Sequence, residues 1–122
     1  MRLRIASTLV VLALLPAAGV SQQQVFNPGD DGVSLPSLIE EVRASYTAAA
    51  YAAGIEGIVE MKGVVLSDGM VGDITVTKSL DAGLDQEAIA AWKRSTFTPG
   101  MKDGQPVAVR VDLQTRFTLK GD

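Results

Sequence analysis

Side chains that could perform covalent or acid–base chemistry are scarce in this sequence of 122 residues. The absence of histidine and cysteine excludes imidazole catalysis, thiolate nucleophiles, disulfides and the usual zinc sites. The carboxylates of Asp81 and Asp85 could transfer protons, but no pattern places two carboxylates in one pocket. Asp68 and Asp103 each bring one carboxylate to a turn, whereas calcium takes about six or more oxygen ligands. We therefore expect no enzymatic activity, no cofactor and no bound metal.

The composition is that of a folded acidic domain. Asp and Glu number 14 against 11 Lys and Arg, which gives a net charge of −3. Nucleic-acid binding depends on a basic surface, so DNA and RNA are not expected partners. Hydrophobic residues make up 47% of the chain and charged residues 20%, close to globular averages, and the length suits one small domain.

The N-terminus has the organisation of a secretory signal peptide over residues 1–21. Arg2 and Arg4 form the positive region, an apolar stretch follows, and small residues suit cleavage between residues 19 and 22. The alternative is an uncleaved membrane anchor over residues 5–20. These 16 residues include a proline and fall short of the roughly 20 that a spanning helix needs. We therefore expect a periplasmic or secreted protein.

The rest of the chain divides into a short leader and one domain. Residues 22–33 are rich in glutamine, glycine and aspartate, so we expect a flexible, unstructured leader. Residues 34–120 form the predicted domain. Within it, residues 36–46 have apolar positions spaced for a helix face, yet Pro36 also allows an extended arm, and the sequence leaves both open.

Two helices are predicted from composition and end signals. Residues 47–53 are rich in alanine, with Ser45 or Thr47 available as a cap and Gly54 suited to the left-handed position after the last turn. Residues 84–95 carry an amphipathic pattern, with acidic residues in the first turn and basic residues in the last.

Strand and turn signals occupy the intervals between these helices. Residues 57–66 are rich in Val, Ile and Met, and a bulge at Gly63 would bring the apolar residues on both sides of it to one face. Asp68-Gly69 supplies the positive φ that a hairpin turn needs, and a second strand begins at Val71. Further along, the sequence indicates a short extended piece at 97–101 and another hairpin turn at 102–105.

The alternation over residues 107–119 is the clearest strand signal in the chain. Only Thr115 interrupts an apolar set consisting of Val107, Val109, Val111, Leu113, Phe117 and Leu119. A period of two indicates one buried and one solvated face. The predicted fold is therefore an α+β two-layer sandwich, in which an antiparallel sheet of three to four strands carries two helices on one face, in the order α-β-β-α-β.

These signals, in this order, resemble the TonB C-terminal domain family, the receptor-binding end of periplasmic energy transducers. The matching positions extend over nearly the whole predicted domain: Gly32-Val33-Ser34, Pro36, Tyr46, Ala50, Gly54, Gly57, Val59, Asp68-Gly69, Val71, Val76, Ser79, Leu84-Asp85, Ala88, Ala91, Phe97, Pro99, Asp103-Gly104 and Pro106-Val107. No single piece is specific, whereas their order and spacing together are.

Three departures from the family pattern bear on function. Thr47 stands where the family often has proline, and Ser95 stands where the family's tryptophan normally lies, while Trp92 comes one helical turn earlier. A full transducer also has a membrane-spanning segment and a long proline-rich spacer, whereas this sequence resembles the domain exported alone.

The resemblance implies a binding mode in which a partner adds a strand to a free sheet edge (β-augmentation). The partner would be the TonB box of a TonB-dependent receptor plug, or another envelope protein of transmembrane transport. The candidate edge is the strand at 107–119, with binding residues Val107, Val109, Arg110, Val111, Asp112, Leu113, Gln114 and Arg116. The alternation proves burial of one face but not an open edge, so this strand could instead be central or covered.

Two other functional readings remain open from the sequence. The domain could self-associate through the same edge as a homodimeric structural envelope protein, or act as a membrane-anchored transducer component if residues 5–20 are retained. Trp92 lies on the apolar stripe of its helix, which favours core packing over an interface anchor. The charged residues of the wet sheet face favour a solvated surface over a docking surface: Glu60, Lys62, Arg110, Asp112 and Arg116.

Overall fold

The computed structural model describes residues 24–120, so the predicted signal peptide at 1–21 lies outside the described part. The elements in chain order are β1 (Val25–Phe26), β2 (Ser37–Glu40), α1 (Ala48–Ala52), β3 (Gly57–Val65), β4 (Val71–Lys78), α2 (Ala82–Arg94), β5 (Thr96–Thr98), β6 (Gly100–Lys102) and β7 (Gln105–Phe117). Within residues 24–120, no helix has the length and apolar character needed to cross a membrane.

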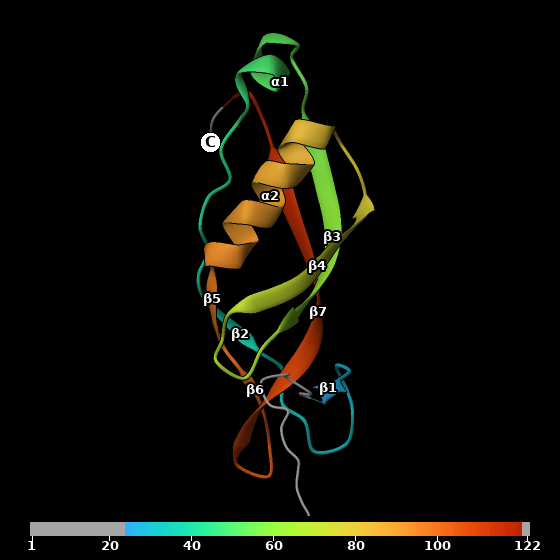
Figure 1. Ribbon diagram of the computed structural model, residues 1–122, viewed down its shortest axis with the longest axis vertical. Coiled ribbons are helices and arrows are strands. Elements are labelled where there is room, and N and C mark those ends of the chain that lie inside the picture. Colours follow the sequence, from blue (N-terminus) through green and yellow to red (C-terminus); the bar gives the residue numbers. More distant parts are fainter. Residues whose placement is uncertain (1–23, 121–122) are drawn as a thin grey trace, which may run out of the picture.

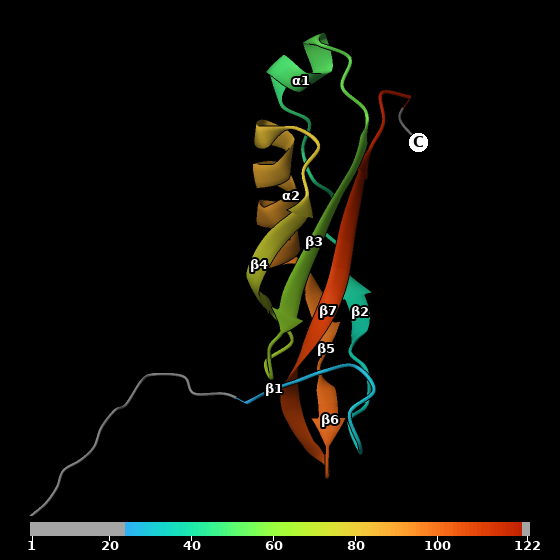
Figure 2. The same ribbon diagram turned by 90° about the vertical axis from the view of Figure 1, so that its right-hand side faces the viewer.

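The main sheet has the strand order β1-β7-β3-β4, with β6 paired to the start of β7. Helix α2 lies against one face of this sheet, and α1 lies beyond the N-terminal end of α2 on the same side (Figures 1 and 2). The predicted α+β class and its two helices are therefore confirmed. Two features were not predicted: β1 pairs parallel to β7, and β2 and β5 form a separate two-stranded sheet.

Both helices begin at the side-chain caps that their sequences provide. The Thr47 hydroxyl accepts from the amide of Ala50 at 3.1 Å, and the Asp81 carboxylate accepts from the amide of Leu84 at 3.0 Å. Before α1, the interval that the sequence left open is an extended arm, because Ser37–Glu40 pairs antiparallel with β5. The paired part of the arm therefore lies near β5 at the C-terminal end of α2, whereas α1 lies beyond the N-terminal end of the same helix (Figure 1).

The core lies between α2 and the sheet. It is built from side chains of β3, β4, α2 and β7 together with Ala50 of α1: Ala50, Val59, Met61, Val65, Val71, Leu84, Ala88, Trp92, Leu113 and Phe117. Residues 57–65 of β3 pair with residues 109–117 of β7 without any shift in register. This regular pair is the rigid centre from which the sheet edges extend.

The predicted bulge at Gly63 is wrong, since the extra residues lie on β4. Only Gly63 separates the pairs Lys62–Thr75 and Val64–Gly72 on β3, whereas Asp73 and Ile74 both lie between them on β4. Asp73 adopts a left-handed φ of 50° at this bulge. Because β3 stays regular, Val65 joins the core and Val64 faces the opposite side of the sheet, where it and Val25 line the same groove.

The expectation of an unstructured leader is also wrong for the described part of residues 22–33. Val25–Phe26 forms β1, and the amide of Asn27 donates to the Asp30 carboxylate at 2.7 Å in the turn that follows. Val33 then bridges to Lys102 in β6. The low apolar content of the leader did not prevent this, because its backbone joins strands that the domain already holds in place.

Asp85 is a buried carboxylate that holds the loop before α2, and we predict a pH-dependent contribution to stability. It accepts from the Ser79 hydroxyl and from the amides of Leu80 (3.0 Å) and Asp81 (3.4 Å). Burial alone would raise the pKa of Asp85, but these hydrogen bonds outweigh burial and hold the pKa below its ordinary value. Replacing Asp85 with asparagine is expected to lower the free energy of unfolding by about 1–3 kcal/mol at neutral pH.

The sign of the pH dependence follows from the lowered pKa. The unfolded carboxyl binds protons more tightly, so the stabilisation is complete above its unfolded pKa of about 3.9 and falls as the pH drops toward the folded value. Denaturant unfolding at pH 7 and at about pH 3 would measure this. The difference between wild type and Asp85→Asn should shrink at the lower pH, and a difference that stays constant would contradict the assignment.

Candidate functional site

Strand β7 is paired along one edge over much of its length and only at its beginning along the other. Residues 109–117 pair with β3. Beyond this contact, β7 pairs with β6 through residues 105–107 and with β1 through Ala108 and Val109. No other strand of residues 24–120 pairs with β7. The outer backbone edge of residues 110–117 is therefore open to another chain.

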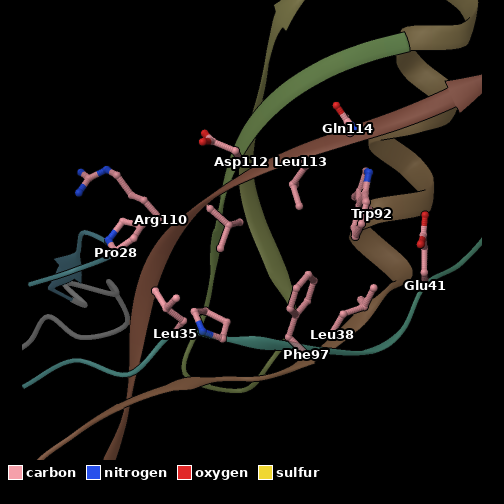
Figure 3. A pocket seen from close by; sticks show the side chains of 12 residues that line it. Pro28, Leu35, Leu38, Glu41, Trp92, Phe97, Arg110, Asp112, Leu113 and Gln114 are labelled. Carbon is pink, nitrogen blue, oxygen red and sulfur yellow. The ribbon is translucent and has the colours of Figure 1, made fainter. Parts of the chain in front are cut away.

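A groove of about 490 Å³ runs along the first part of this open edge (Figure 3). One wall is β7 itself, and the opposite wall is the extended arm. The lining residues are Pro28, Leu35, Pro36, Leu38, Glu41, Trp92, Phe97, Arg110, Val111, Asp112, Leu113 and Gln114. Leu38 and Phe97 lie close together across from Leu113 in Figure 3, so the interior of the groove is largely apolar.

Trp92 forms part of the groove while remaining anchored in the core. Its indole N–H donates to the Thr115 hydroxyl at 3.0 Å, and its ring lies 6.1 Å from the ring of Phe97. Only 7% of Trp92 is exposed. The indole needs a buried acceptor, which explains why a threonine interrupts the apolar face of β7. Trp92 thus packs in the core, as the sequence favoured, and presents one side to the groove.

A second groove, of about 560 Å³, lies over the polar face of the sheet beside the same edge. It shares Pro28, Arg110, Val111 and Asp112 with the first groove and is otherwise lined by Val25, Asn27, Lys62, Gly63, Val64, Asp73, Thr75 and Thr77. The Lys62 ammonium donates to the Asp112 carboxylate at 2.9 Å, with both side chains mostly exposed. Such an exposed ion pair stabilises the fold by at most about 1 kcal/mol, so the side chains of this face remain solvated and free to rearrange.

The comparison with known proteins decides the family. The family model described as "Gram-negative bacterial TonB protein C-terminal" matches residues 42–119, which is well over half of the chain. The chain belongs to the TonB C-terminal family. Protein TonB of Vibrio cholerae serotype O1 is 34% identical over 91 residues, which cover 73% of this chain and 37% of that protein. The chain thus spans little more than a third of the length of this curated relative.

Solved TonB C-terminal domains share the fold. The solution structure of the Pseudomonas aeruginosa TonB domain has a TM-score of 0.60 at 25% identity, covering 84% of this chain and 99% of that one. The solution structure of the Helicobacter pylori TonB domain has a TM-score of 0.50 at 28% identity, covering 66% of this chain and 85% of that one. The chain therefore has both the family signature and the fold of a TonB C-terminal domain.

The structure of this TonB-like domain divides the eight predicted binding residues into three groups. Five of them line the groove beside the open edge: Arg110, Val111, Asp112, Leu113 and Gln114. Val107 and Val109 instead lie where β6 and β1 already pair with β7, and Val109 is fully buried. Arg116 lies farther along the open edge and is exposed outside the groove. The candidate site therefore begins at Arg110 rather than at Val107.

Sequence reasoning missed the opposite wall of the groove. Pro36 and Leu38 belong to the interval 36–46 that the sequence left open, and Leu35 immediately precedes it. The sequence feature that could have revealed this wall is the presence of two leucines close to Pro36, in a stretch where no predicted helix would bury them. Leu35 is 63% exposed and Leu38 is 46% exposed, so the folded domain buries neither side chain completely. Within residues 24–120, no group of three or more acidic side chains is arranged to hold a metal ion.

Proposed function

We propose that this domain binds an extended segment of an envelope protein as an added strand along residues 110–117 of β7. The observation that carries the proposal is the open outer edge of β7 with a groove on either side of it. Backbone N–H and C=O groups along such an edge provide affinity that tolerates many sequences. In a TonB-like domain, the segment we infer is the TonB box of a TonB-dependent receptor plug, and the compartment is the periplasm.

The two grooves define the chemistry of the partner segment. Side chains of an added strand point alternately to the two faces of the sheet. On one face they would meet the apolar interior that Leu38, Trp92 and Phe97 provide. On the other face they would meet Lys62, Asp112 and the threonine hydroxyls of β4. We therefore expect a partner segment in which apolar and polar residues alternate.

The opposite edge of the sheet is poorly suited to the same role. Strand β4 carries two irregularities in register, and Asp73 at one of them adopts a left-handed φ of 50°. Bulges and polar side chains are the devices by which natural sheets block edge-to-edge pairing. Strand β7 has no such irregularity in its pairing with β3 over residues 109–117. The structure therefore favours β7 as the edge that accepts a strand.

Titration of the isotope-labelled protein with a panel of TonB-box peptides would test this function. We expect the backbone amide signals of residues 110–117 to shift, with much smaller changes along β4. The absence of shifts along β7 with every peptide would reject the proposal. Dilution without peptide is the control for self-association, because two copies paired through β7 would give concentration-dependent shifts along the same strand.

A pair of N-methylated peptides would show whether backbone pairing drives binding. Neighbouring amides of a strand point to opposite edges, so methylating every second amide blocks one edge and leaves the other intact. Two peptides of identical sequence, methylated in the two alternate registers, differ only in the edge that is blocked. We expect the peptide methylated in one register to bind about tenfold or more weakly than the unmethylated peptide, and the peptide methylated in the other register to bind with nearly the same affinity as the unmethylated one. Equal affinity for both registers would mean that side chains alone hold the segment.

A further inference from the structure

The segment that precedes the arm occupies the beginning of the β7 edge. Val25 and Phe26 pair parallel with Ala108 and Val109 on β7. Immediately after this pair, Arg110 Nη1 donates to Asn27 Oδ1 at 3.0 Å. Pro28 then lines both of the grooves that flank the open edge. Because Val109 also pairs with Val65 of β3 on its other side, β1 occupies the start of the outer edge that an added strand would use.

Few contacts hold this segment in place. Its strand comprises two residues, and both side chains are only half-buried. The Lys102 ammonium lies 5.9 Å from the centre of the Phe26 ring and donates to the carbonyl of Asp31 at 3.1 Å. By comparison, β3 pairs with β7 through nine residues in continuous register. Short pairings with exposed hydrogen bonds are the first to open locally.

We propose that β1 is a resident edge strand that competes with the partner segment. In the free protein it covers Ala108 and Val109 and limits an added strand to residues 110–117. A longer partner segment displaces β1 and pairs with those two residues as well. This inference rests on the proposed function and concerns the regulation of the same edge. Affinity for long segments is then reduced by the fraction of molecules in which β1 is docked.

A reversible covalent lock provides a direct test. Val25 and Ala108 are direct strand partners, and neighbouring strands lie about 4.8 Å apart, within the Cα separation that a disulfide accepts. The natural chain contains no cysteine, so the double variant Val25→Cys/Ala108→Cys has a single possible intramolecular disulfide. Its reduced form is the matched control, because the two forms differ only in whether β1 can leave the edge.

Binding would be measured by calorimetry and amide shifts with two TonB-box peptides, of about six and about twelve residues. The short peptide reaches only residues 110–117, whereas the long one can also reach Ala108. Oxidation is expected to lower the affinity for the long peptide about tenfold or more and to leave the affinity for the short peptide unchanged. Equal affinity of the long peptide for the oxidised and reduced forms would overturn the competition.

A second variant is expected to raise the affinity for the long peptide, and its test does not depend on disulfide formation. Phe26→Ser removes the ring that contacts Lys102 and weakens the docking of β1, so affinity for the long peptide should rise by about fivefold. A fall in affinity would show instead that β1 helps to build the site, which overturns the inference. If neither peptide binds any form of the protein, the proposed function and the competition are both rejected. If the long peptide binds the oxidised and reduced forms equally well, only the competition is rejected.

Discussion

Replacing Gly69 with alanine is expected to lower the free energy of unfolding by about 2–4 kcal/mol. Gly69 occupies the turn between β3 and β4 with a φ of +86°, which costs any other residue conformational strain. A Cβ at this position would lie 2.2 Å from the carbonyl oxygen of Phe97. That oxygen belongs to the backbone of β5, so it cannot move aside as a flexible side chain would.

The close contact between Gly69 and Phe97 also links the β3–β4 turn to β5. The amide of Phe97 donates to the carbonyl of Gly69 at 2.9 Å, which ties the β3–β4 turn to β5. Because β5 carries Phe97 into the groove, an added methyl group should also disturb the floor of the candidate site. Denaturant unfolding followed by circular dichroism would measure the stability change.

Gly104→Ala is the matched control for this prediction. Gly104 lies in the turn between β6 and β7 with a φ of +78°, but a Cβ there would meet no atom within 4 Å. Its replacement should therefore cost only the conformational strain, about 1 kcal/mol. If both alanine variants lost the same stability, the close approach to Phe97 would have no energetic weight.

Replacing Leu38 with aspartate is expected to weaken binding of a TonB-box peptide by about thirtyfold, with little loss of stability. Leu38 is 46% exposed in the free domain, so the fold gains little from its burial. It lines the apolar wall of the groove opposite β7. A carboxylate there would be desolvated by an added strand, and the cation among the lining residues, Arg110, already donates to Asn27. Calorimetry with the same peptide would measure the change.

Ile39→Asp is the matched control for Leu38→Asp. Ile39 is the next residue of β2, is 66% exposed and does not line the groove. The two variants introduce the same charge into the same strand, so any unspecific effect of charge or β-propensity should be equal. Peptide affinity should remain within about twofold of wild type for Ile39→Asp. Equal losses in the two variants would place the partner segment elsewhere.

Local signals in the sequence were sufficient for most of the elements. The alternation over residues 107–119 identified β7, and Asp68-Gly69 and Asp103-Gly104 marked the two hairpin turns. Thr47 was one of the two residues expected to cap the start of α1, and it is the one that does so. Each of these features depends on the side-chain period or on the φ angle of neighbouring residues, so a short stretch of sequence contains the necessary information.

Tertiary structure alone decided where the sheet is open. The same alternation would be expected of a central strand or an edge strand, because it reports only which side chains are buried. Whether the outer amides of residues 110–117 have partners depends on β1 ending after Phe26 and on the arm turning away to pair with β5. Those pairings join residues about 60 to 80 positions apart, where no local periodicity gives information. Local patterns therefore determined most of the elements and the family, whereas the long-range pairing determined the site.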